Sequence, residues 1–507
     1  MHARTTLLQR LLAAGAALSL VAALGASAGV ARAITPPTIT VIDIHPEGSS
    51  LALDHDDTEA VAVGDILLFA AEDATHGREL YKSDGTVAGT ALVKDINPTS
   101  DSEVEYMVAM GNTAYFRADD GTNGVELWKS DGTAAGTVMV KNINPTGDSA
   151  VRDLLVVGST IYFRAENGTD GIELWKSDGT TAGTVMVKDI NQTGSTDSEP
   201  RNFTAIGSTI YFKATDGTNG VELWKSDGTT AGTVMVKNIN PSGADSHPSN
   251  LIAFGSTIYF EAYDGTNGEE LWKSNGTEAG TVMVKNINPS AESFPDYLTV
   301  LGSTIYFKAT DGTNGEELWK SDGTEAGTVM VKDINPSADS YPNGLTLLGS
   351  AIYFEATDGT NGYELWKSDG TTAGTVMVKN IDTASNSGSV RAITRHGNLL
   401  YFQAQDAVNG VEMYLSDGTE AGTMRIPAPS ATDYISCDCF DYPVMSTSIG
   451  VFFTYYDSTV GHELGFIGGR LPETNATGSA LTLALLALSG ALAAGAVIAR
   501  RTELRAN

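Results

Sequence analysis

One loop sequence, Asp-Gly-Thr-Asn-Gly, recurs along the chain and carries oxygen atoms that are suited to binding a metal ion. Carboxylate, amide and carbonyl oxygens in a flexible loop are the ligands that calcium prefers. We therefore consider a calcium site in these loops, which open with Asp120, Asp216, Asp264, Asp311 and Asp358. The alternative is a structural role, because tight hairpins need positive φ, and Asp or Asn bonds the local backbone there. Calcium is the one cofactor considered.

A second motif, Glu-Leu-Trp-Lys-Ser-Asp-Gly-Thr, also recurs, and we interpret its polar residues as structural. Ser-Asp-Gly-Thr is typical of a turn with hydroxyl bonds to the backbone. The Glu is expected to pair with Lys or hydroxyl groups across strands, and a catalytic carboxylate pair is the alternative. The chain has no H-E-x-x-H, G-x-S-x-G or P-loop motif, and its histidines are scattered.

Catalysis needs one asymmetric cluster of groups, whereas near-identical units present the same groups repeatedly. We therefore predict a non-enzymatic protein without catalytic residues.

The second motif recurs eight times at nearly fixed spacing. Its aromatic residues follow one another at intervals of 47 to 49 residues and are Tyr81, Trp128, Trp175, Trp224, Trp272, Trp319, Trp366 and Tyr414. A period of this length indicates an array of similar supersecondary units.

Each unit reads as four short strands joined by hairpins, as in residues 297–334. Successive residues of these strands are apolar, so both faces of the sheet need a neighbour. A ring of radially stacked sheets provides one, and we predict an all-β fold, a β-propeller. Trp319 is expected between adjacent sheets, and Lys332 on an outer strand, where its charge discourages edge-to-edge pairing.

The two ends of the repeat region supply complementary parts of one more unit. Residues 39–46 resemble the last strand of a repeat, and the segments from Gly450 and His462 resemble a second and a third strand. Pairing them would close the ring. We predict about nine blades and regard eight as acceptable.

The recurring motif resembles that of bacterial ELWxxDGT-repeat proteins, and the resemblance covers about residues 39–468. It implies an exported bacterial surface protein with propeller-like repeats. It carries no catalytic residues over to this chain.

Both chain ends have the pattern of targeting segments. Residues 1–33 combine a basic start, an apolar run and Ala-Arg-Ala, which predicts a cleaved signal peptide. Residues 469–478 hold Leu471, Pro472, Glu473, Thr474 and Asn475, and they resemble an LPxTG-like cell-wall sorting signal with Asn in the place of Gly. A transmembrane helix over 479–499 and a basic cytoplasmic tail over 500–507 are expected to follow. The protein would then be attached to the cell wall by a sortase, or held in the membrane by the helix.

The net charge of −31 argues against a nucleic-acid partner, which needs a basic surface. Cys437 and Cys439 are either locally bridged or free. We predict that residues 34–468 form a surface-anchored propeller that binds an extracellular protein or glycan, or serves the envelope or adhesion. The alternatives are a secreted propeller hydrolase or lyase acting on polysaccharide, with its site near Cys437 or in the axial channel, and a calcium-stabilised scaffold.

Overall fold

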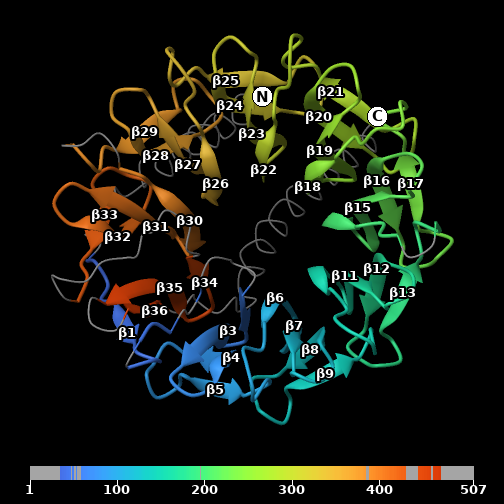
Figure 1. Cartoon of the computed structure of the whole chain (residues 1–507). Coiled ribbons are helices and arrows are strands. Elements are labelled where there is room, and N and C mark those ends of the chain that lie inside the picture. Colours follow the sequence, from blue (N-terminus) through green and yellow to red (C-terminus); the bar gives the residue numbers. More distant parts are fainter. Residues whose placement is uncertain are drawn as a thin grey trace, which may run out of the picture.

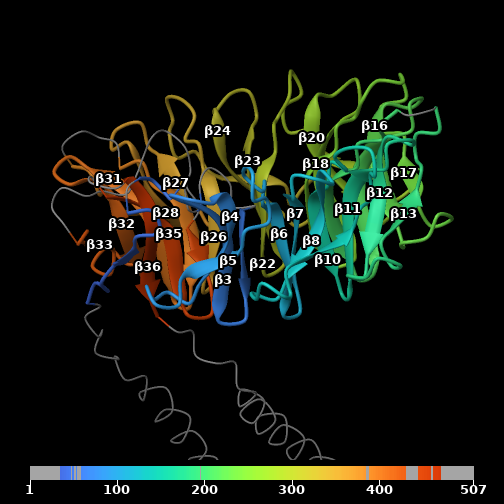
Figure 2. The ribbon, with the colours of Figure 1, turned by 60° about the horizontal axis from the view of Figure 1, so that its bottom comes forward.

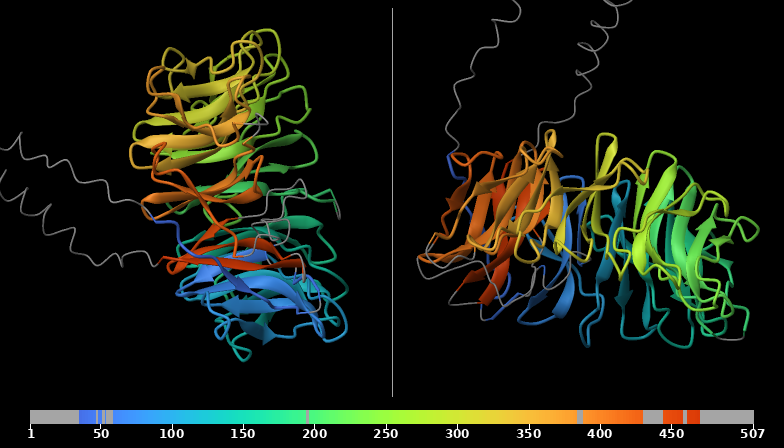
Figure 3. Two further views of the ribbon diagram at one scale, coloured as in Figure 1. Left: turned by 90° about the vertical axis from the view of Figure 1, so that its left-hand side faces the viewer. Right: turned by 90° about the horizontal axis from the view of Figure 1, so that it is seen from above.

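The computed structural model describes residues 35–46, 48–50, 53, 59–193, 196–383, 388–429, 444–457 and 461–469. Within them the chain forms nine four-stranded antiparallel sheets and no helix. The sheets are the blades of a β-propeller, arranged around one axis (Figure 1). Seen from the side, they make a disk with loops on both faces (Figures 2 and 3). The prediction of an all-β propeller with nine blades is confirmed.

Eight blades are continuous in sequence, and each runs from its inner to its outer strand. Blade 1 holds β2 (Ala60–Val63), β3 (Ile66–Asp73), β4 (Gly77–Ser83) and β5 (Ala91–Lys94). Blade 2 holds β6 (Glu105–Met110), β7 (Thr113–Asp119), β8 (Val125–Ser130) and β9 (Val138–Lys141). Blade 3 holds β10 (Arg152–Val157), β11 (Thr160–Glu166), β12 (Ile172–Ser177) and β13 (Val185–Lys188). Blade 4 holds β14 (Arg201–Ile206), β15 (Thr209–Thr215), β16 (Val221–Ser226) and β17 (Val234–Lys237).

The next four blades follow the same order. Blade 5 holds β18 (Ser249–Phe254), β19 (Thr257–Tyr263), β20 (Glu269–Ser274) and β21 (Val282–Lys285). Blade 6 holds β22 (Asp296–Leu301), β23 (Thr304–Thr310), β24 (Glu316–Ser321) and β25 (Val329–Lys332). Blade 7 holds β26 (Asn343–Leu348), β27 (Ala351–Thr357), β28 (Tyr363–Ser368) and β29 (Val376–Lys379). Blade 8 holds β30 (Arg391–His396), β31 (Leu399–Asp406), β32 (Gly410–Ser416) and β33 (Met424–Ile426).

Blade 9 is built from both ends of the repeat region, as predicted. It contains β34 (Met445–Ser446), β35 (Gly450–Asp457) and β36 (Gly461–Gly468), and its outer strand is β1 (Thr40–Ile42). The register pairs Thr40 with Phe466 and Ile42 with Leu464. The ring is therefore closed by hydrogen bonds between strands from opposite ends of the repeat region.

The hydrophobic core lies between the blades. Trp319 of blade 6 is 5% exposed and packs with Tyr259 and Leu271 of blade 5, which confirms its predicted position. Phe307, from the second strand of blade 6, is fully buried in the same cluster. Equivalent clusters recur around the ring, so each blade covers its neighbour's apolar face.

Two lysines of each blade from 1 to 7 bind backbone carbonyls of the next blade. In blade 6, Lys320 Nζ donates to Gly370 O at 2.8 Å, and Lys332 Nζ donates to Thr375 O at 2.9 Å. Lys332 also lies over the Trp366 ring, 5.6 Å from its centroid. Lys332 lies on the outer strand, as predicted, and its ammonium also joins two blades, a contact that the sequence did not indicate; its effect on edge-to-edge pairing stays a prediction. We call these residues the lysine pairs.

The two interfaces that close the ring use apolar side chains in the same positions. In blade 8, Leu415 and Ile426 take the places of the lysine pair, and in blade 9 Phe466 and Ile42 do so. All four side chains are buried. We call these two interfaces the apolar seam. They close the ring by burying hydrocarbon, whereas the other interfaces also use charge-assisted hydrogen bonds.

Several predicted features lie outside the described residues. They are the signal peptide over 1–33, the sorting signal with Leu471 to Asn475, the helix over 479–499, the tail over 500–507, and Cys437 and Cys439. None of the described segments is a helix that could span a membrane.

Candidate functional site

The loop between the second and third strands of a blade lies on the same face of the disk as the loop that leads to the next blade. In blade 2, Val125 N donates to Asp148 Oδ1 at 2.9 Å, and Ser149 N donates to Val125 O at 2.8 Å. We call this side the loop face. All five aspartates considered for calcium lie on it, as the alternation of strands predicts.

Each of those five aspartates closes its own turn. Asp120 Oδ1 accepts the backbone N–H groups of Thr122 and Asn123, and its Oδ2 accepts Asn123 Nδ2 at 2.8 Å. Asp216, Asp264, Asp311 and Asp358 repeat this pattern in their own blades, so the five do not converge on one site. Among the described residues, no three His, Cys, Asp or Glu side chains are grouped to hold a metal. Calcium binding stays a prediction.

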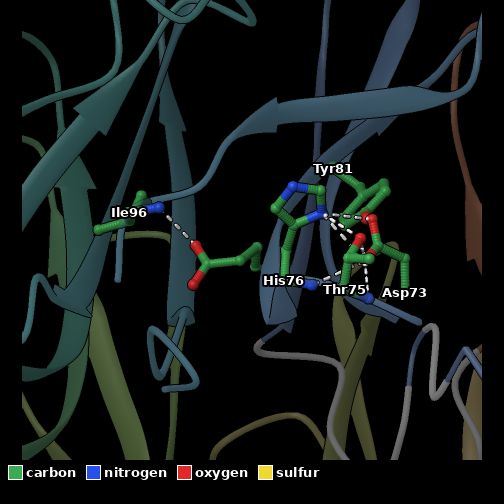
Figure 4. Close-up of polar contacts among 6 residues, drawn as sticks. Asp73, Thr75, His76, Tyr81 and Ile96 are labelled. Atoms are coloured by element: carbon green, nitrogen blue, oxygen red, sulfur yellow. Dashed lines mark hydrogen bonds and ion pairs between the residues drawn. The ribbon is translucent and has the colours of Figure 1, made fainter. Parts of the chain in front are cut away.

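Blade 1 departs from the loop sequence and places a histidine there. Asp73 takes the turn-closing role, accepting the backbone N–H groups of Thr75 and His76 (Figure 4). His76 Nδ1 lies 2.8 Å from Asp73 Oδ2, and Tyr81 Oη also donates to that carboxylate oxygen. The hydrogen bond to Asp73 raises the pKa of His76. This cluster closes a local turn, and the histidine adds one titratable group to it.

The glutamate before Leu-Trp, or its equivalent, is buried in every blade, and in blades 1 to 7 it accepts a backbone N–H from the loop that leads to the next blade. Glu270 is fully buried, and its two oxygens accept the backbone N–H groups of Ile287 at 2.7 Å and Asn288 at 3.1 Å. Ser293 Oγ donates to it at 2.8 Å. Figure 4 shows the equivalent bond to Ile96 in blade 1. The predicted hydroxyl partner is present, but the main partners are backbone amides rather than lysine.

The Ser-Asp-Gly-Thr segment forms the expected turn on the opposite face. Asp131 Oδ1 accepts the backbone N–H of Thr133 at 2.9 Å and its hydroxyl at 2.7 Å. Ser130 Oγ lies 2.8 Å from Thr137 Oγ1. These side chains are used within the turn.

The inner strands of blades 2 to 8 begin on the loop face with a β-bulge. In blade 5 the register shifts between Ser249 and Ile252, and Asn250 has φ +54°. A left-handed backbone is unfavourable for residues other than glycine. A β-bulge changes the direction in which the neighbouring side chains point. The same conformation is found at Tyr106, Asp153, Asn202, Tyr297, Gly344 and Ala392.

The position opposite the first residue of each inner strand varies from blade to blade. From blade 2 to blade 8 it holds Arg117, Arg164, Lys213, Glu261, Lys308, Glu355 and Gln403. We call these residues, together with the first two residues of each inner strand, the inner rim. The blade framework is uniform, whereas the inner rim is not.

One part of the inner rim gathers unlike polar groups around Glu261. Ser249 Oγ donates to Glu261 Oε2 at 2.6 Å, and Asn250 Nδ2 donates to the same oxygen at 3.1 Å. Burial raises the pKa of Glu261, and the carboxylates of Glu269 and Asp296 raise it further. Asp296, on the next blade, lies 3.8 Å from the Lys308 ammonium. The cluster thus contains two unlike acids. Glu261 tends to keep its proton, whereas Asp296 lies beside the Lys308 ammonium.

A cavity of about 410 Å³ lies beside this cluster. It is lined by inner-strand residues of blades 4, 5 and 6, namely Asn202, Phe203, Asn250, Leu251, Ile252, Asp296, Tyr297 and Leu298. Tyr297 is 42% exposed, and the nearby Phe294 is 43% exposed. The site therefore combines a polar cluster, a cavity and exposed aromatic rings.

No protein-family model and no curated protein matches this chain. Among solved structures, it is similar to a puromycin hydrolase, with 11% identity and a TM-score of 0.39 over 83% of this chain and 61% of that one. It is also similar to a prolyl endopeptidase, with 11% identity and a TM-score of 0.39 over 70% of this chain and 55% of that one. The chain thus spans less than two thirds of the length of either protein. A likeness at this level carries no activity over.

The prediction of a non-enzymatic binding protein is corrected: the similar solved structures are those of a hydrolase and an endopeptidase, and the uniformity of the units on which the prediction rested fails at the inner rim. The physical reason lies in the inner rim. Repetition of the framework does not make every position uniform, and one asymmetric cluster of carboxyl groups lies in blades 5 and 6, at Glu261 and Asp296.

The sequence contained a signal for Glu261 that was missed. The second strands read Tyr-Phe followed by a variable residue and then Ala, and the variable residue is an acid in blades 5 and 7. Because this position varies in most blades, an acid at one of them does not stand out along the sequence. The polysaccharide-enzyme alternative placed its site near Cys437 or in the axial channel. The inner-strand cavity fits the second location.

Proposed function

We propose that the protein is a polysaccharide hydrolase that works at the Glu261 cluster. The observation that carries the proposal is Glu261 itself, half-buried and hydrogen-bonded by Ser249, facing a second carboxylate beside the cavity. Glycoside hydrolysis needs two carboxyl groups of unlike protonation, and a raised pKa suits the one that donates a proton.

In the proposed reaction, Glu261 protonates the glycosidic oxygen while the bond from this oxygen to the anomeric carbon breaks. Asp296, which lines the cavity, takes a proton from a water whose oxygen bonds to the anomeric carbon. The exposed rings of Tyr297 and Phe294 offer apolar faces on which sugar rings can stack. Ser249 and Asn250 orient the Glu261 carboxyl.

The test is the release of reducing ends from a panel of polysaccharides by the purified chain. Glu261→Gln keeps the acceptor for Ser249 but cannot donate a proton, so activity should fall by about 100-fold or more. Glu355→Gln is the matched control, because Glu355 holds the same position in blade 7, and it should retain activity within about twofold. Full activity of the Glu261 variant would refute the assignment. An unsaturated product, seen by its ultraviolet absorbance, would indicate a lyase instead.

We also propose that the enzyme works outside the cell and is anchored at the surface. The support is the sequence pattern of residues 1–33 and of residues 469–507. Cell fractionation with antibody against the propeller tests this, and a cytoplasmic location would contradict it.

A further inference from the structure

Five cations gather on the inner rim of blades 2 to 4. They are Arg117, Arg152, Arg164, Arg201 and Lys213, and we call them the cationic arc. The chain carries a net charge of −31, and its lysines other than Lys213 and Lys308 all belong to the lysine pairs. The cationic arc is therefore an exception to the acidic character of the chain.

Carboxylates neutralise only part of the cationic arc. Arg117 pairs with Glu105 at 2.7 Å, Arg164 Nε lies 2.7 Å from Asp153, and Glu199 contacts Arg164 and Arg201. Within the described part of the chain, neither Arg152 nor Lys213 has an ion-pair partner.

Lys213 is half-buried, so water hydrates its ammonium group incompletely. Burial lowers the pKa of the Lys213 ammonium, and the like charge of Arg201 lowers it further. Arg152 is exposed, and its guanidinium lies over the Tyr106 ring at 5.8 Å. Asp153 and Glu261 act on the Lys213 ammonium from beyond ion-pair distance, so a bound anion would give Arg152 and Lys213 the direct ion pair that neither makes with a described carboxylate.

The cationic arc leads directly to the Glu261 cluster. Arg201 is followed by Asn202 and Phe203, which line one end of the cavity, and Asp296 lines it in blade 6. Lys213 interacts electrostatically with Glu261. A chain held at the arc by charged groups would therefore extend along the cavity toward the carboxyl groups.

We propose that the substrate is an anionic polysaccharide whose carboxylate or sulfate groups are held by Arg152, Arg201 and Lys213 while the adjoining sugars occupy the cavity. This rests on the proposed hydrolase function and names its substrate class. Guanidinium groups bind planar oxyanions through paired hydrogen bonds, which suits such a ligand. Because the rest of the protein repels polyanions, binding should be confined to this arc and weaken with salt.

The test measures binding apart from catalysis, using the full chain with Glu261→Gln and calorimetry. The ligands are tetragalacturonate, a sulfated galactan tetrasaccharide and neutral galactotetraose. We expect at least one anionic ligand to bind about tenfold or more tightly than the neutral one, with affinity that falls as salt rises. Changing Arg152 and Arg201 together to Gln should remove that preference. Both side chains are exposed, so the fold should survive.

The matched control is Arg391→Gln, because Arg391 is an exposed first residue of an inner strand outside the arc. It should leave the preference unchanged. Equal binding of neutral and anionic ligands, or an anionic preference that survives the double variant, would overturn the proposal. If the anionic preference is found but no polysaccharide is cleaved, the binding site stands and the hydrolase function fails. If only neutral polysaccharides are cleaved, the hydrolase function stands and the anionic binding site fails.

Discussion

The apolar seam makes a quantitative prediction for Ile42, the side chain through which the N-terminal strand closes the ring. Ile42 is 1% exposed and packs in a cluster with Leu67 and Phe69 of blade 1 and with Phe452 and Leu464 of blade 9. Ile42→Ala removes three buried carbon groups, worth about 0.8 kcal/mol each. Adding the cost of the cavity that is left gives a loss of about 3 kcal/mol in the free energy of unfolding.

Urea denaturation followed by tryptophan fluorescence measures this loss, because the tryptophans lie between the blades. Val138→Ala is the matched control, since Val138 is on the outer strand of blade 2 and is 39% exposed. It should change the free energy by less than about 0.5 kcal/mol. Limited proteolysis should cut the Ile42 variant first within residues 36–46. A loss below about 1 kcal/mol, or cleavage that begins elsewhere, would refute the closure role of this strand.

Three other predictions concern the repeated framework. Burial raises the pKa of Glu126 to about 7 from 4.5, so its stabilising contribution is full below about pH 4.5 and is lost as the pH rises to about 7; the melting temperature should fall from pH 5 to pH 8. Lys225→Met removes the bond to the next blade, and urea denaturation should show a loss of about 1–2 kcal/mol. Gly228→Ala should lower the melting temperature by several degrees, because φ is +83° and a Cβ would lie 2.4 Å from Tyr162 Oη.

Each of these has a control within the chain. Glu126→Gln should reduce the slope of the pH dependence only by the share of one of these equivalent buried glutamates, and an unchanged slope would contradict the burial argument. Val185→Ala is the control for Lys225→Met, because Val185 is exposed. Its free energy of unfolding should equal that of the wild type. Gly207→Ala also places a side chain at positive φ but meets no atom within 4 Å. If it costs as much as Gly228→Ala, backbone strain rather than the tyrosine contact sets the loss.

The sequence by itself determined the fold. The interval between Trp128 and Trp175, repeated along the chain, fixed the unit, and apolar residues on both strand faces required neighbours on both sides. The likeness of residues 39–46 to a last strand predicted the closure with β36. These properties are local or periodic, so they can be recognised along one dimension.

Only the tertiary structure decided the site. Glu261 and Asp296 belong to different repeats, and each looks like an ordinary substitution when its own repeat is considered alone. They come together because the ring places the second strand of one blade against the inner strand of the next, with a bulge turning the first residues. The role of Lys332 was hidden for the same reason. Contacts between blades depend on packing geometry, and the spacing along a single repeat does not encode them.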